Sequence, residues 1–235
     1  MDSSCHQVIE TDGVVIIVDG EVPRWASEEL RHLGGVDVVV LESRTLATAL
    51  KSVAEKSTVS SRGRTHLLFP GNGGAKVRRL LNLNGIPAWS VHAKRFWHPG
   101  SNPTFEVGQV HTGQFLHLGV DHVIVFDDVI STGGTAALVY ERNSWKFPGA
   151  QWCVGALISR GRLKRLRQGY ERVFSAVRVQ HPTDLARQVP INTLSTLLEN
   201  QDIAKSYARR NFFAKETERF IELLNELRHY NERDC

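Results

Sequence analysis

The strongest structural signal in the sequence is the stretch Val123-Ile124-Val125-Phe126-Asp127-Asp128-Val129-Ile130-Ser131-Thr132-Gly133-Gly134-Thr135, near the middle of the chain. Its first four residues are apolar and predict a buried strand, which two acidic residues follow. Small and hydroxyl-bearing residues then lead into a helical pattern over Gly134–Glu141. Free backbone N–H groups at a helix N-terminus hold anions well, and glycine lets a ligand approach the backbone closely. The stretch therefore predicts a strand, an anion cradle and a helix, in that order.

The adjacent carboxylates of Asp127 and Asp128 indicate what else binds beside the anion. Two acids next to a phosphate would repel it unless they serve another group. Sugar hydroxyls, which donate to carboxylates, and Mg²⁺ are the two candidates. A ligand with a phosphate, a diol and a magnesium-bound diphosphate satisfies the whole stretch. The alternative is purely structural, with Ser131 or Thr132 serving only as the N-cap of the helix.

Outward from this stretch, short apolar runs alternate with helical patterns. We expect strands at Val14–Val18, Val36–Leu41, Thr65–Phe69, Pro87–Ala93, His122–Phe126, Trp152–Ser159 and Val173–Val179. We expect helices at Ala26–His32, Arg44–Lys56, about Ala75–Asn82 and Gly134–Glu141. Strands without clean period-2 alternation, separated by helices, indicate a mostly parallel sheet covered on both faces. The predicted fold class is thus a doubly wound α/β architecture, with ligands at the carboxyl ends of the strands.

Two segments stand apart from this alternation. Leucine and phenylalanine recur at helical spacing in residues 191–235, which predicts a C-terminal helical extension packed on an α/β domain of residues 1–190. The connection Arg95–Asp121 is long for a compact domain. It is either a flexible loop that covers an active site or a β-hairpin without a role in function, since Thr104–Val110 is β-prone.

Composition narrows the class of protein. The chain has 235 residues, 41% hydrophobic and 23% charged, as in ordinary soluble domains. Its net charge of +4 favours anionic partners. No apolar run is long enough to span a bilayer, and the polar N-terminal stretch lacks a signal-peptide core, so we expect a cytoplasmic protein. The 3 cysteines form no disulfide framework, and the 10 histidines form no zinc motif.

The stretch 123–135 resembles the phosphoribosyl-pyrophosphate signature of the type I phosphoribosyltransferase family, with four apolar residues, two acids and a Thr-Gly-Gly-Thr-like turn. The resemblance implies that Asp127 and Asp128 contact the ribose hydroxyls, with Mg²⁺ carried by the substrate near these acids. It implies a 5′-phosphate cradle of Ser131, Thr132, Gly133, Gly134 and Thr135. The family's pyrophosphate-binding loop follows an earlier strand, and this place is taken here by Asn72, Gly73, Gly74 and Lys76.

The resemblance extends over about residues 65–179 and is nearest to the orotate enzymes. Lys94 and Arg95 stand where those enzymes often carry an Arg-Lys pair that meets pyrophosphate, and Arg160 stands near an acceptor-binding arginine. Two departures leave the acceptor open. Ser131 replaces the third acid of hypoxanthine-guanine enzymes, and the long connection has no lysine after Lys94.

The leading hypothesis is a Mg²⁺-dependent glycosyltransferase of nucleotide metabolism. It moves the phosphoribosyl group from phosphoribosyl pyrophosphate to a nucleobase-like nitrogen and releases pyrophosphate; by family analogy it is a homodimer. The second hypothesis is a non-catalytic regulator that senses the same ligand and binds nucleic acid, suggested by the basic cluster 160–172. The sequence has no recognisable nucleic-acid-binding module, so this hypothesis ranks second. A third is a partner subunit that binds through its C-terminal helices.

Overall fold

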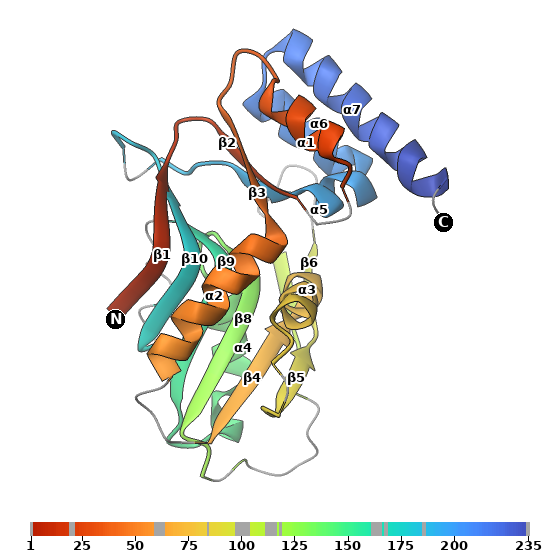
Figure 1. The fold of residues 1–235 in the computed structure, drawn as a ribbon. Helices are drawn as coiled ribbons and strands as arrows, with labels where there is room; N and C mark the ends of the chain where they lie inside the picture. Colours follow the sequence, from red (N-terminus) through yellow and green to blue (C-terminus); the bar gives the residue numbers. More distant parts are fainter. Residues whose placement is uncertain are drawn as a thin grey trace. The chain divides into compact units, whose positions relative to one another are not determined.

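The computed structural model describes residues 2–18, 22–58, 64–83, 85–96, 104–110, 117, 119–160, 166, 169–184 and 187–233 (Figure 1). The chain forms two compact units. The larger unit contains residues 1–8 and 47–178, and the smaller unit contains residues 9–46 and 179–235.

The larger unit is built on a six-stranded sheet. Its strand order is β1-β10-β9-β8-β4-β5, with β1 at Asp2–Glu10, β10 at Arg172–Gln180, β9 at Gln151–Arg160, β8 at His122–Ile130, β4 at Thr65–Pro70 and β5 at Ala88–Val91. The neighbours β5, β4, β8 and β9 are all parallel. The predicted mostly parallel α/β sheet is therefore confirmed.

Both faces of this sheet are apolar and carry helices. On one face, Val123 and Val125 of β8 share a buried cluster with Ala136 of α4 (Gly134–Asn143). On the other face, the Phe126 ring stacks on Phe69 with centroids 5.7 Å apart. Helix α3 (Gly71–Leu81) covers that second face, and Figure 1 shows α3 in front of the sheet with α4 behind it. The sheet is doubly wound, as predicted, because alternate side chains of one strand need cover on both sides.

Part of the long connection forms an antiparallel hairpin. Strand β6 (Ala93–Phe96) pairs with β7 (Thr104–Val107), so that Lys94 lies opposite Glu106. The single strand expected at 87–93 is in fact split between β5 and β6. The expected hairpin is thus present, whereas residues 97–103 and 111–116 lie outside the described part of the chain.

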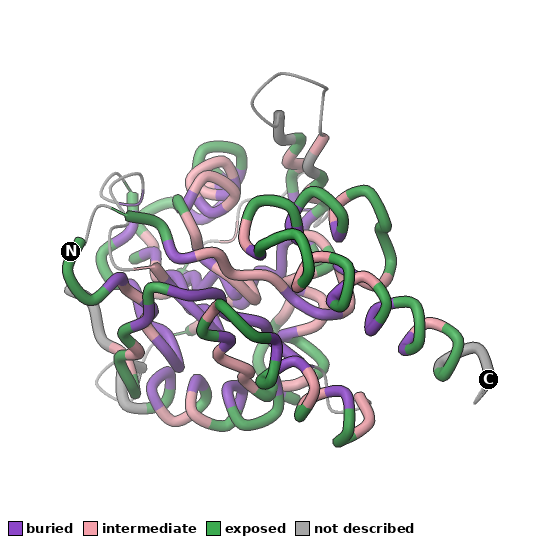
Figure 2. Tube along the Cα trace, turned by 90° about the horizontal axis from the view of Figure 1, so that it is seen from above, coloured by how far each residue is buried: buried purple, intermediate pink, exposed green. Residues whose placement is uncertain are grey.

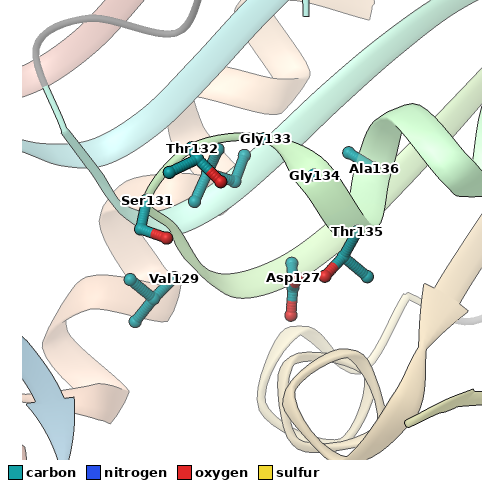
Figure 3. Close-up of a pocket in the computed structure, with 9 residues that line it drawn as sticks. Asp127, Val129, Ser131, Thr132, Gly133, Gly134, Thr135 and Ala136 are labelled. Atoms are coloured by element: carbon teal, nitrogen blue, oxygen red, sulfur yellow. The ribbon is translucent and has the colours of Figure 1, made fainter. Parts of the chain in front are cut away.

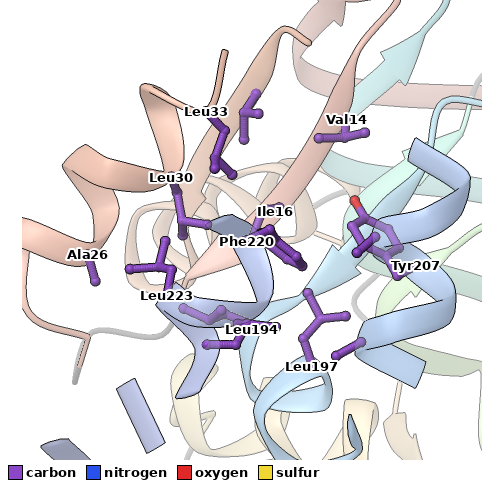
Figure 4. Packing of buried hydrophobic residues seen from close by; sticks show 14 of the residues in the cluster. Val14, Ile16, Ala26, Leu30, Leu33, Leu194, Leu197, Tyr207, Phe220 and Leu223 are labelled. Atoms are coloured by element: carbon purple, nitrogen blue, oxygen red, sulfur yellow. The ribbon is translucent and has the colours of Figure 1, made fainter. Parts of the chain in front are cut away.

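The smaller unit joins the two ends of the chain. Strands β11 (Ile191–Thr193), β2 (Val14–Val18) and β3 (Val38–Glu42) form a parallel sheet. Helix α2 (Ser43–Thr58) follows β3 directly, and from Ala47 onward it belongs to the larger unit. The helices of the smaller unit are α1 (Arg24–Arg31), α5 (Leu194–Glu199), α6 (Gln201–Asn211) and α7 (Ala214–Arg233). Their buried side chains share one core, in which Phe220 and Leu223 of α7 meet Leu30 of α1 and Ile16 of β2 (Figure 4).

This arrangement differs from the expected division at residue 190. Because Val15 pairs with Ile191, residues 9–46 fold with the C-terminal helices, whereas residues 1–8 belong to the larger unit. The C-terminal helices themselves were expected, and buried and exposed residues alternate along α7 as its spacing indicated (Figure 2). Within the described residues, no helix has the length and apolar character needed to cross a membrane.

Candidate functional site

The paired acids lie inside the last part of β8. This strand continues to Ile130, three positions beyond Asp127, because its pairing with β9 extends to Ile130 opposite Ser159. Asp127 Oδ1 accepts a hydrogen bond of 3.0 Å from the Asp128 backbone N–H. Asp128 Oδ1 accepts one of 2.7 Å from Val129 N–H. Both carboxylates are half-buried, and these local bonds hold each in a defined orientation.

The predicted anion cradle forms a pocket at the end of this strand (Figure 3). Its lining is made of Asp127, Val129, Ile130, Ser131, Thr132, Gly133, Gly134, Thr135 and Ala136. All the residues expected around the 5′-phosphate therefore line one pocket together with Asp127. The N-cap of α4 is Gly133, and no side chain caps this helix. The alternative of a structural cap by Ser131 or Thr132 is thus wrong, and the first-turn N–H groups and the helix dipole face the pocket.

Glycine is required at the N-cap of α4. Gly133 has φ of 79°, in the left-handed region that L residues rarely adopt. A Cβ there would also lie 2.5 Å from Leu166 Cγ, and Leu166 is completely buried. Leu166 thus packs directly against Gly133 and supports the backbone of the cradle. Sequence reasoning did not identify it, because a single apolar residue inside a basic cluster carries no signal of its own.

Tyr170 supports the first turn of α4 and was also not identified from the sequence. Its hydroxyl donates a 2.7 Å hydrogen bond to the Ala136 carbonyl. Burial, and then the neighbouring Tyr140 and Asp127, raise the pKa of Tyr170 well above its usual range. The phenol therefore stays protonated and keeps donating to α4 at any pH near neutrality.

The glycine-rich turn expected to bind pyrophosphate is the first turn of α3. This helix begins at Gly71, earlier than the expected start near Ala75. Gly71 has φ of 56°, and a Cβ there would lie 2.7 Å from the Ala93 carbonyl oxygen. A Cβ on Gly73 would lie 2.6 Å from Asp127 Oδ1 and closer still to Asp128 Oδ1. The structure thereby brings the start of α3 into direct contact with the paired acids.

The other expected pyrophosphate residues of α3 lie in different surroundings. Asn72 is exposed in the same first turn, and Lys76 is half-buried one turn further on. Gly74 is buried, and a Cβ on it would lie 2.5 Å from the Phe69 carbonyl carbon. Gly74 therefore allows α3 to pack closely on β4.

The remaining expected residues lie on neighbouring strands. Lys94 is exposed on β6, with its Nζ 5.1 Å from the centre of the Phe96 ring. Arg95 follows it in the same strand, opposite Phe105. Arg160 is the last residue of β9 and directly follows Ser159. Since β8 and β9 are parallel, Arg160 lies at the same edge of the sheet as the cradle.

The acids fit a Mg²⁺ ion that takes most of its ligands from elsewhere. Among the described residues, no group of three or more His, Cys, Asp or Glu side chains could hold a metal ion by itself. Mg²⁺ is commonly held by one or two carboxylates together with water and substrate phosphates. Asp127 and Asp128 would supply the two carboxylates of such a site, and the uncapped N-terminal turn of α3 beside them would hold the phosphates.

Comparison with known proteins gave similarities only among solved structures. No family model and no curated protein matches the sequence. The structures include the purine phosphoribosyltransferase of Pyrococcus horikoshii Ot3, with 17% identity over 63% of this chain and 87% of that chain, and a TM-score of 0.42. They also include the orotate phosphoribosyltransferase of Aeropyrum pernix, with 21% identity over 67% and 75% of the two chains, and a TM-score of 0.36. A hypothetical protein from Neisseria gonorrhoeae with bound ppGpp has 15% identity over 79% and 92%, and a TM-score of 0.44.

Phosphoribosyltransferases, the family that the signature resembles, thus recur among the solved structures to which this chain is similar. At these identities and TM-scores the similarities assign neither an activity nor a substrate. The α/β class is established by the strand order and pairing given above.

Proposed function

We propose that the protein is a phosphoribosyltransferase, which transfers the 5-phosphoribosyl group of phosphoribosyl pyrophosphate to a nucleobase-like nitrogen and releases pyrophosphate. One observation carries this proposal: a Cβ on Gly73 would collide with the carboxylates of both Asp127 and Asp128. The N-terminal turn of α3, the paired acids and the cradle before α4 therefore form one continuous site. Its three parts suit a diphosphate, a diol and a phosphate, in that order.

In this proposal the two ends of the donor are held by backbone and the middle by carboxylates. The N–H groups of Gly134 and Thr135 bind the 5′-phosphate, with the hydroxyl of Thr135 as a further donor. Asp127 and Asp128 accept hydrogen bonds from the ribose hydroxyls. The first turn of α3 binds the diphosphate through its N–H groups, since no side chain caps that helix either. Holding both ends fixes the anomeric carbon between them, where the acceptor nitrogen displaces pyrophosphate.

The charges of the site favour the transition state of this displacement. As the bond to pyrophosphate breaks, positive charge develops on the ribose ring, and the carboxylates of Asp127 and Asp128 lie beside it. When bound, Mg²⁺ neutralises negative charge that accumulates on the leaving diphosphate. Lys94 on β6 adds a cation for the same group. Arg160, at the same edge of the sheet, is the candidate that binds an acceptor with an anionic or carbonyl substituent.

Acceptor-dependent release of pyrophosphate tests this proposal. The protein is incubated with phosphoribosyl pyrophosphate, Mg²⁺ and single nucleobases, including orotate, and released pyrophosphate is measured. We expect release with one class of base and its loss in the Asp127→Asn/Asp128→Asn variant. Asp202→Asn, an exposed acid in the first turn of α6, is the matched control and retains the wild-type rate. Binding of the donor without release for any base would contradict the transferase and favour the sensing regulator.

A further inference from the structure

The C-terminal end of α4 holds the root of the β6–β7 hairpin. Asn143, the last residue of α4, is fully buried. Its Oδ1 accepts a 2.6 Å hydrogen bond from Val110 N–H, and its Nδ2 donates to the Gly108 carbonyl at 3.3 Å. A third bond, of 2.9 Å to the Val139 carbonyl, fixes the amide against its own helix. One side chain therefore connects α4 to the backbone that directly follows β7.

A buried lysine holds the same backbone from the next turn. Lys146, in the short helix η1 (Ser144–Lys146), is 4% exposed, and its Nζ donates to the Val110 carbonyl at 2.5 Å. The Lys146 carbonyl accepts a 2.7 Å bond from His117 N–H, and the His117 ring stacks on Phe147 at 4.8 Å. Burying an ammonium group is costly unless it is paired. The two backbone groups of Val110 are thus both hydrogen-bonded, the N–H to Asn143 at the end of α4 and the carbonyl to Lys146 in η1.

The other side of the hairpin root is held by α3. Gly108 N–H donates a 2.8 Å hydrogen bond to the His92 carbonyl. This bond joins the two chain segments just outside the paired residues of β6 and β7. The next carbonyl, that of Ala93, lies against Gly71 at the start of α3, where a Cβ would be only 2.7 Å away. Lys94 follows immediately. Its backbone is therefore fixed by α3 on one side and, through Gly108 and Val110, by α4 on the other.

Helix α4 thus begins at the phosphate cradle and ends at Asn143, which together with Lys146 forms the anchor of the hairpin root. We propose that Asn143 and Lys146 are positioning residues, which set the place of Lys94 over the pyrophosphate end of the site through the root of the β6–β7 hairpin. The inference rests on the proposed function, because it assigns Lys94 to the leaving diphosphate. Neither residue touches the substrate, and both act through backbone atoms of Gly108 and Val110.

A double-mutant cycle with separate ligands for the two ends of the site tests this inference. The affinities for Mg²⁺-pyrophosphate and for ribose 5-phosphate are measured by calorimetry in wild type, Asn143→Leu, Lys94→Ala and the double variant. Losing one charge-assisted contact weakens pyrophosphate binding about tenfold. We expect this loss in each single variant and no further loss in the double variant. Ribose 5-phosphate, which binds only the cradle and the acids, keeps its wild-type affinity in all of them.

Two further variants separate positioning from a general loss of stability. Lys146→Met removes one anchor bond and keeps the others, so it gives a smaller loss of pyrophosphate affinity even if Asn143→Leu does not fold. Thr193→Val removes the buried side-chain cap of α5, in which Thr193 Oγ1 accepts a hydrogen bond from Thr196 N–H, and leaves both affinities unchanged.

The outcomes distinguish this inference from the proposed function. Normal pyrophosphate affinity in Asn143→Leu and in Lys146→Met would overturn the inference while the proposed function stood. Additive losses in the double variant would also overturn it, because the anchor would then not act through Lys94. If the wild type bound neither ligand, the proposed function would fail and the inference with it.

Discussion

Replacing Gly73 by alanine separates ligand binding from folding at this site. The new Cβ would lie 2.6 Å from Asp127 Oδ1 and closer to Asp128 Oδ1. Both carboxylates have to turn away. In doing so they give up their bonds from the N–H groups of Asp128 and Val129. The substitution therefore moves the groups that we assign to the ribose hydroxyls without touching the cradle.

The two consequences have different magnitudes. Alanine is favoured over glycine within a helix by roughly 0.5–1 kcal/mol. The loss of the two hydrogen bonds from backbone N–H groups to the carboxylates costs about 1 kcal/mol each, so the free energy of unfolding falls by only about 1 kcal/mol in total. Binding of the donor loses hydrogen bonds from two hydroxyls to charged acceptors, each worth about 1.5–3 kcal/mol. We therefore expect affinity for phosphoribosyl pyrophosphate to fall by roughly a hundredfold or more.

Denaturant unfolding and calorimetric titration with Mg²⁺-phosphoribosyl pyrophosphate measure the two quantities on the same samples. The matched control is Gly34→Ala, where the new Cβ would meet Glu216 Oε1 at an ordinary 3.7 Å and neither quantity should change. Gly74→Ala is the contrasting variant. Its Cβ would meet the Phe69 backbone at 2.5 Å, so it should lose about 2 kcal/mol of stability. Wild-type donor affinity in Gly73→Ala would refute the assignment of the acids to the ribose.

Three further predictions concern the supports of the fold. Gly133→Ala places a Cβ at φ of 79°, which costs about 1–2 kcal/mol; calorimetry should show ribose 5-phosphate binding lost as well. Burial and the neighbouring His117 lower the pKa of His66 to about 4, so the folded state keeps this imidazole neutral. The stabilisation linked to this lowered pKa is fully present above 6.5, the pKa of His66 in the unfolded chain. It declines as the pH falls from 6.5 towards 4, because the unfolded chain then binds a proton that the folded protein does not. After allowance for partial exposure it amounts to about 1 kcal/mol, and unfolding of His66→Phe at pH 7 and 4.5 should lack this decline. Arg228 donates to two carbonyls at the end of α5 at 2.8 and 3.0 Å, and unfolding of Arg228→Ala should show a loss of about 1–2 kcal/mol.

The central part of the site could be predicted because its signals are local. One short stretch contains the apolar run before Asp127, the paired acids and the two glycines. The apolar run predicts the strand, and the glycines predict the tight turn into the helix. The length of β8 could not be predicted in this way. Its extension to Ile130 depends on pairing with Ser159 of β9, a contact between distant parts of the chain.

Features that depend on contacts between distant residues were missed or misplaced. Glycine has a low helix propensity, so Gly71 was assigned to a turn. The Ala93 carbonyl beside Gly71 and the paired acids beside Gly73 leave no room for a Cβ, so the first turn of this helix requires glycine at both positions. The strand β11 is too short for a periodic pattern, and nothing local shows that it pairs with β2. The roles of Tyr170 and Asn143 follow from bonds to residues more than 30 positions away.

We claim that this one site binds phosphoribosyl pyrophosphate, and the decisive experiment is a calorimetric titration of the wild type with Mg²⁺ and this donor. We predict saturable binding that requires Mg²⁺ and is lost in Asp127→Asn/Asp128→Asn, while ribose 5-phosphate competes for the cradle. The Asp202→Asn control should bind as the wild type does. No heat of binding in the wild type, or binding of equal affinity in the double variant, would contradict the claim.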